Sequence, residues 1–104
     1  MTDALAARIA AALRDVEDFP QPGVRFKDIA PLLADGPLMR DVIAAFADDA
    51  HRYGHLDLVA GAEARGFMFA GGLALQLGCG LVPLRKAGKL PPPTLRRSYT
   101  LGYG

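Results

Sequence analysis

Apolar residues recur at helical spacing in three segments of the chain. Residues 2–16 are rich in alanine and predict a first helix, which a following Phe-Pro pair would stop. A second helix is expected to begin near Asp35, with a proline suited to its first turn, and to end at Gly54. Residues 66–77 are apolar almost all round. They predict a third helix, buried against a sheet on one side and another element on the other.

Short apolar runs between these helices predict strands at 57–62 and 81–84, and an extended piece is expected at 23–29. The run at 57–62 is continuously apolar after its first residue, as in a parallel sheet covered on both faces. Residues 86–104 show no periodicity and include three consecutive prolines, which predicts a loop or arm. The order of strand, helix and strand indicates an α/β fold with a parallel sheet flanked by helices.

Composition narrows the class of protein. The 104 residues suffice for one domain at most, and twelve cations against eleven carboxylates argue against a dedicated nucleic-acid binder. Cys79 is the one cysteine, so an intrachain disulfide framework is excluded, and no Cys/His spacing indicates zinc. The first residues lack the cationic start and apolar run of a signal peptide, so none is expected, and the longest apolar run is too short to span a bilayer. We expect a soluble cytoplasmic domain that binds no membrane.

Candidate chemistry gathers where the strand at 57–62 ends. Glu63 and Arg65 lie in a turn before the third helix, whose first N–H groups can bind an anion. Arg65 could grip a phosphate bidentately. The next strand releases Arg85, Lys86 and Lys89 toward the same edge if the two strands are parallel. Two interpretations stand on geometry alone, a phosphate or pyrophosphate site and an ordinary strand-helix-strand unit with surface cations.

Four motifs together resemble the adenine phosphoribosyltransferases. They are FPQPGVRFKDI at 19–29, EARGFMF at 63–69, RKAGKLP at 85–91 and SYTLGYG at 98–104. The resemblance implies an N-terminal portion of a type I phosphoribosyltransferase fold. It implies transfer of ribose 5-phosphate from phosphoribosyl pyrophosphate (PRPP) to adenine, giving AMP and pyrophosphate in purine salvage. It further implies Mg²⁺ bound with PRPP or pyrophosphate, no metal held directly by side chains, and a homodimer.

The resemblance assigns two groups of binding residues. Adenine is expected against the ring of Phe26, its edge paired to backbone groups nearby; the adenine-binding set is Val24, Arg25, Phe26 and Lys27. By composition alone, Phe26 is a core residue after a Pro-Gly turn. The set expected to bind pyrophosphate or PRPP is Ala64, Arg65, Gly66, Lys86, Lys89 and Tyr103. Glu63, two residues before Arg65, is expected either to orient Arg65 or to bind Mg²⁺ indirectly.

Two departures from the family pattern concern activity. Where the family carries a glutamate thought to handle the adenine proton, this chain has Gly102, so no catalytic residue is assigned. An acidic pair followed by Thr-Gly-Gly, which in the family cradles the PRPP 5′-phosphate, does not occur in the sequence. Residues 1–104 are thus expected to form a single incomplete domain, with 87–104 as an active-site flap or a disordered tail. We expect little or no activity from this chain alone. The alternative is a non-catalytic remnant, or a regulatory nucleotide-binding module that pairs with another chain.

Overall fold

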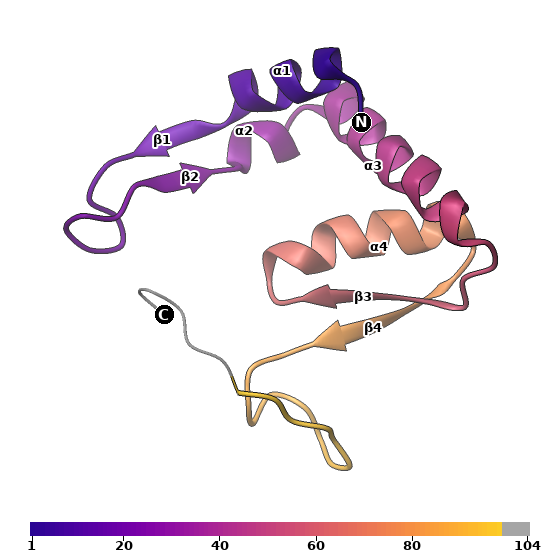
Figure 1. Ribbon diagram of the computed structural model, residues 1–104. Coiled ribbons are helices and arrows are strands. Elements are labelled where there is room, and N and C mark those ends of the chain that lie inside the picture. Colours follow the sequence, from indigo (N-terminus) through magenta and orange to yellow (C-terminus); the bar gives the residue numbers. More distant parts are fainter. Residues whose placement is uncertain (99–104) are drawn as a thin grey trace. The chain divides into compact units, whose positions relative to one another are not determined.

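The computed structural model describes residues 1–98, which fall into two compact units, 1–45 and 46–98 (Figure 1). Each unit contains one two-stranded sheet, antiparallel in the first and parallel in the second. Within the described residues, no helix is both long and apolar enough to cross a membrane. The motif residues Gly102 and Tyr103 lie outside the described part of the chain.

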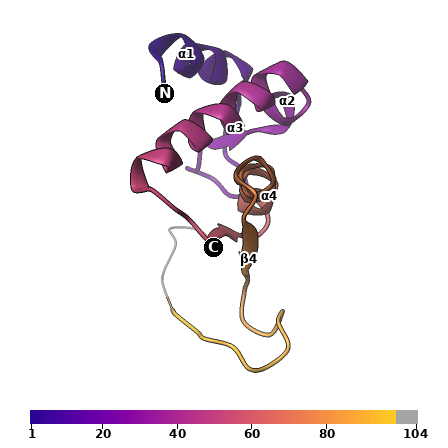
Figure 2. The same ribbon diagram turned by 90° about the vertical axis from the view of Figure 1, so that its right-hand side faces the viewer.

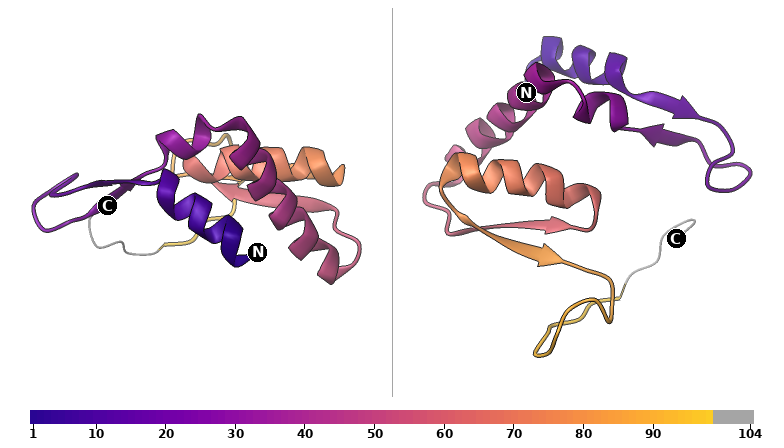
Figure 3. Two further views of the ribbon diagram at one scale, coloured as in Figure 1. Left: turned by 90° about the horizontal axis from the view of Figure 1, so that it is seen from above. Right: turned by 180° about the vertical axis from the view of Figure 1, so that it is seen from behind.

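The first unit combines a β-hairpin with helices. Its elements are α1 (Asp3–Ala12), β1 (Arg14–Val16), β2 (Phe26–Asp28), α2 (Ala30–Leu33) and the first part of α3 (Gly36–Ala50). The hairpin pairs Arg14 with Asp28 and Val16 with Phe26, and it extends beyond α1 and α2 in Figure 3. The second helix was predicted close to where α3 begins, and that prediction is confirmed.

The predicted first helix is wrong over its last residues. Helix α1 ends at Ala12, Leu13 is already extended, and residues 14–16 form β1. Their pairing with β2 supplies ladder hydrogen bonds and opposed charges that local helix propensity does not outweigh. Helix α2 was also missed, because four residues are too few to show a helical period.

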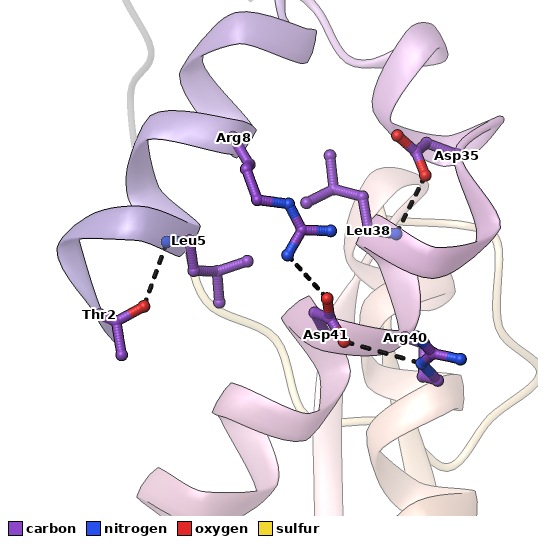
Figure 4. A network of polar contacts seen from close by, with 7 residues as sticks. All are labelled: Thr2, Leu5, Arg8, Asp35, Leu38, Arg40 and Asp41. Carbon is purple, nitrogen blue, oxygen red and sulfur yellow. Dashed lines mark hydrogen bonds and ion pairs between the residues drawn. The ribbon is translucent and has the colours of Figure 1, made fainter.

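Helix caps and a few buried leucines order the helices of this unit (Figure 4). The Thr2 hydroxyl accepts a hydrogen bond from the Leu5 N–H at 3.1 Å, and Asp35 accepts one from the Leu38 N–H at 3.0 Å. Arg8 of α1 reaches Asp41 of α3 at 2.7 Å. The buried apolar side chains of the unit are Leu5, Leu32, Leu38 and Val42.

The second unit is a strand-helix-strand motif. It contains η1 (His51–Tyr53), β3 (Leu58–Ala62), α4 (Arg65–Leu77) and β4 (Gly80–Leu84). Strands β3 and β4 are parallel, with Leu58 beside Gly80 and Ala62 beside Leu84. The two strands and the third helix predicted from the sequence are therefore confirmed, each within one residue at its ends. Residues 85–98 contain no helix or strand, in agreement with the expected loop.

Small residues let α4 approach β3 closely. A Cβ at Gly61 would lie 2.6 Å from the Ala70 Cβ and 2.7 Å from the Gly66 carbonyl oxygen, so only glycine fits. Ala70 and Ala74 are the buried residues of α4. Figure 2 shows α4 end-on above β4, on one face of the strand pair.

Helix α4 was expected to be buried on both sides, and the structure leaves part of it open. Met68 is 45% exposed and Leu75 is 86% exposed. All five residues of β4 are exposed as well. Within the described residues of this unit, the fully buried residues of α4 thus lie on the side of the helix that meets β3.

Candidate functional site

The start of α4 is open to an anion in its local geometry. Its N-cap residue, Ala64, offers no side-chain oxygen, so the first N–H groups of the helix have no side-chain cap. Arg65 and Gly66 are the first two residues of α4, and Arg65 is exposed. The Glu63–Ala64 peptide before them is cis. Uncapped N–H groups and the positive end of the helix dipole together favour negative charge here.

The cationic loop follows β4 at the same edge of the sheet. The parallel register ends with Ala62 beside Leu84, and the Glu63 N–H continues it by donating to the Leu84 carbonyl at 2.9 Å. The loop then turns tightly, with the Lys89 N–H donating to the Lys86 carbonyl at 3.2 Å. The structure therefore brings the Arg65 turn and the Lys86–Lys89 turn to one edge, as the sequence predicted.

Glu63 lies among the cations of this edge. Its carboxylate accepts a hydrogen bond from the Lys86 N–H and lies 3.5 Å from the Arg85 Nε. The Lys86 N–H, together with the charges of Arg85 and Lys89, holds the pKa of the Glu63 carboxyl below its usual range. The arginine that Glu63 contacts in this way is Arg85, which follows β4 directly.

The residues expected to bind adenine lie on the hairpin of the first unit. Val24 closes the loop, since its N–H donates to the Gln21 carbonyl at 3.2 Å and its carbonyl accepts from Phe19 at 3.0 Å. The side chains of Arg25 and Lys27 form ion pairs across the hairpin with Glu17 and Asp15. The cationic groups of this set are thus bound to carboxylates, which leaves Phe26 and the backbone as the chemistry available to a base.

Phe26 has an aromatic neighbour that the sequence interpretation did not assign to the site. The Phe19 and Phe26 ring centroids are 5.1 Å apart at 67°, an edge-to-face contact. Phe26 is half-buried and Phe19 is 49% exposed. The signal was present in the sequence, because two phenylalanines flank a Pro-Gly turn between segments of opposite charge.

A shallow pocket lies at the other end of α4. It is lined in part by His51, His55 and Cys79. His55 pairs with Asp57 at 2.8 Å, and the Cys79 thiol donates to the Leu56 carbonyl at 3.0 Å. Both histidines are exposed, and Cys79 is half-buried. No group of three metal-binding side chains occurs among residues 1–98, at this pocket or elsewhere.

Sequence comparison finds close relatives along the entire chain, although no family model matches it. The adenine phosphoribosyltransferase of Thermobifida fusca is 52% identical over 104 residues, which are 100% of this chain and 58% of the relative. Over its whole length the chain is similar in sequence to the adenine phosphoribosyltransferases. It spans slightly more than half the length of the curated adenine phosphoribosyltransferases that it matches.

Solved adenine phosphoribosyltransferases share the fold. The enzyme of Rhodothermus marinus superposes with a TM-score of 0.85 and 43% identity, over 99% of this chain and 58% of its own. That of Saccharomyces cerevisiae, complexed with adenine and an imino-altritol bisphosphate, gives a TM-score of 0.80 and 38% identity, over 88% of this chain and 56% of its own. The expected α/β fold, as a partial phosphoribosyltransferase fold, is thereby confirmed.

Proposed function

We propose that this chain carries the adenine-binding and pyrophosphate-binding parts of an adenine phosphoribosyltransferase. The observation that carries the proposal is the edge of the parallel strands, where Arg65, Lys86 and Lys89 accompany the uncapped start of α4. With Arg85 included, four cationic side chains lie at this edge with one carboxylate, that of Glu63, and the excess of positive charge favours binding of an anion. The relationship to adenine phosphoribosyltransferases gives that anion a chemical identity, the diphosphate of PRPP.

The reaction breaks the bond between ribose C1 and the pyrophosphate oxygen and forms a bond from C1 to adenine N9, which loses its proton. Negative charge grows on the leaving pyrophosphate in the transition state. Lys86, Lys89 and the α4 N–H groups would stabilise that charge, which is the role of positioned electrostatic groups in such reactions. Phe26 would hold the base by stacking, and no covalent nucleophile is required from the protein.

Mg²⁺ belongs to the proposal as a companion of the diphosphate. Glu63 is committed to Arg85 and Lys86, so the acidic group at this edge does not by itself form a metal cage. Diphosphate oxygens and water are ligands that Mg²⁺ prefers, and the ion would therefore come and leave with them.

We further propose, from the family relationship, that the protein acts in the cytoplasm as a homodimer. The proton acceptor is left unassigned, since Gly102 has no side chain to serve.

Calorimetry with pyrophosphate tests the anion site directly. We expect the full chain to bind pyrophosphate, and Arg65→Ala to weaken the affinity by roughly 10–100-fold, the scale of one or two lost charge-assisted hydrogen bonds. Arg52→Ala is the matched control, because Arg52 is an arginine of the same unit that pairs with Asp49 and lies outside the proposed site. Equal affinity of the wild type and Arg65→Ala would mean that pyrophosphate binds elsewhere or not at all.

Labelled adenine tests the chemistry. We expect the 104-residue chain with PRPP and Mg²⁺ to make AMP slowly or not at all, because the sequence contains no Thr-Gly-Gly loop for the PRPP 5′-phosphate. Positioning of that phosphate supplies much of the rate in a two-substrate reaction. Binding without turnover would support the binding roles proposed here. Rapid, steady AMP formation would show that the residues present suffice for the whole reaction and would overturn the expectation of weak activity.

A further inference from the structure

Glu63 occupies an unusual place for a carboxylate, at the rim of a site proposed to bind anions. It follows β3 directly, and its N–H extends the strand ladder to Leu84. Its side chain is only 15% exposed. One carboxylate oxygen, Oε1, serves both the Lys86 N–H and the Arg85 Nε. A single acceptor thus joins the end of β3 to the first two residues after β4.

Arg85 extends this contact to two further elements. Its guanidinium carbon lies 5.9 Å from the ring centroid of Phe67, in the first turn of α4. Its Nη1 lies 3.5 Å from the Lys89 carbonyl oxygen, at the long end of hydrogen-bond distances. Arg85 therefore touches the helix start, the strand end and the cationic loop together, and Glu63 fixes it there.

The loop that is held in this way carries the proposed anion-binding lysines. Lys86 is fixed at its backbone by Glu63, and the Lys89 N–H turns back onto the Lys86 carbonyl. Both lysines are exposed, so neither side chain is held by burial. Preorganised charges stabilise an anion more than mobile ones, because less ordering is required when the anion binds.

We propose that Glu63 is a positioning residue of the anion site. Its carboxylate holds Arg85 and the Lys86 backbone, so that the Lys86–Lys89 turn presents its cations beside the start of α4. The inference rests on the proposed function, because it assigns a role within the same pyrophosphate site. A positioning role and simple charge repulsion predict opposite changes in pyrophosphate affinity when Glu63 is removed. A negative charge near a bound anion repels it, so charge alone predicts tighter binding without Glu63, whereas loss of the positioning contact predicts weaker binding.

Calorimetry at constant ionic strength tests whether removal of Glu63 weakens or strengthens pyrophosphate binding by the full chain. We expect Glu63→Ala to bind pyrophosphate roughly tenfold more weakly than the wild type, the size of one lost charge-assisted hydrogen bond. Glu63→Gln should lose less, because its amide oxygen can still accept the Lys86 N–H. Asp57→Ala removes an exposed carboxylate at the other end of β3 and should leave the affinity unchanged.

Amide hydrogen exchange gives a readout that is independent of the ligand. We expect the Lys86 amide to exchange faster in Glu63→Ala than in the wild type, and Glu63→Gln to restore most of the protection. The double variant Glu63→Ala/Arg85→Ala should lose less binding free energy for pyrophosphate than the two single variants lose in sum, because the two residues share one contact.

The outcomes separate this inference from the proposed site. If Arg65→Ala weakens pyrophosphate binding while Glu63→Ala binds as tightly as the wild type or more tightly, the positioning role is wrong and the anion site stands. If the wild type binds no pyrophosphate, both fail. Should Glu63→Ala not fold by circular dichroism, Glu63→Gln decides: an affinity equal to or above that of the wild type overturns the inference.

Discussion

The two units of the chain use charge in opposite ways. On the hairpin of the first unit, each cation meets a carboxylate across the strands, in the pairs Arg14–Asp28, Lys27–Asp15 and Arg25–Glu17. At the edge of the parallel strands in the second unit, a single carboxylate, Glu63, lies among several cations. In the first unit, the paired charges stabilise the hairpin that carries the aromatic surface. In the second unit, the excess of positive charge favours binding of a negatively charged ligand.

The units also differ in how they pack. Branched apolar side chains fill the first, with Leu38 only 2% exposed. In the second, glycine and alanine bring a helix and a strand into close contact. A core of large side chains tolerates change by repacking, whereas a contact between backbones leaves no room for an added atom.

The largest expected effect follows from that contact. Gly61→Val should destabilise the second unit by about 3 kcal/mol or more, because its new Cβ would overlap Ala70 and the Gly66 carbonyl. Urea unfolding followed by circular dichroism measures the change. Gly71→Ala in α4 is the control: nothing lies near its added Cβ, so it should leave stability unchanged or raise it by about 0.5–1 kcal/mol. Equal stability of the two variants would contradict the packing described for Gly61.

An intermediate effect is expected at the aromatic surface of the hairpin. Phe26→Leu keeps an apolar side chain but removes the ring face, so adenine binding should weaken by about 1–3 kcal/mol, the scale of base stacking. Equilibrium binding of labelled adenine measures this change. The matched control, Phe46→Leu, alters an edge-to-face pair of the second unit, Phe46–Phe69, and should not affect adenine binding. Adenine affinity that is indifferent to Phe26 would remove the hairpin from the proposed site.

The smallest expected effect is a loss of folding stability at low pH, through the carboxylates of Asp15 and Asp41. Hydrogen bonds from Lys27 and Arg8 hold the pKa values of Asp15 and Asp41 below their ordinary value of 3.8. Lowered folded-state pKa values stabilise the fold above pH 3.8, and this contribution is lost as pH falls through the folded values. Unfolding midpoints in urea should therefore drop in that window, and less steeply in Asp15→Asn/Asp41→Asn. Both pairs are exposed, so about 1 M salt should also weaken their contribution. Identical pH profiles for the variant and the wild type would show that these pairs are not linked to folding.

Local patterns were enough to predict the second unit. Helix α4 and strands β3 and β4 are marked by continuous apolar runs and bounding glycines, and a strand-helix-strand order fixes which ends of the strands meet. For that reason the sequence alone assigns Arg65, Lys86 and Lys89 to one edge of the sheet. Each element of this region carries its own apolar pattern, and the strand-helix-strand order makes the two strands parallel neighbours although they are distant in sequence.

Contacts between distant residues were decided only in three dimensions. Residues 14–16 continue an alanine-rich helix by local preference, yet they pair with 26–28, and the opposed charges that favour this pairing lie far apart in the sequence. The partner of Glu63 likewise depended on strand register, because Lys86 is 23 residues away and only the parallel alignment places its N–H at the carboxylate. Helix propensity, caps and apolar periods are local properties and were determined by the sequence itself. Pairing partners depend on which distant segments meet, and that is a property of the folded chain.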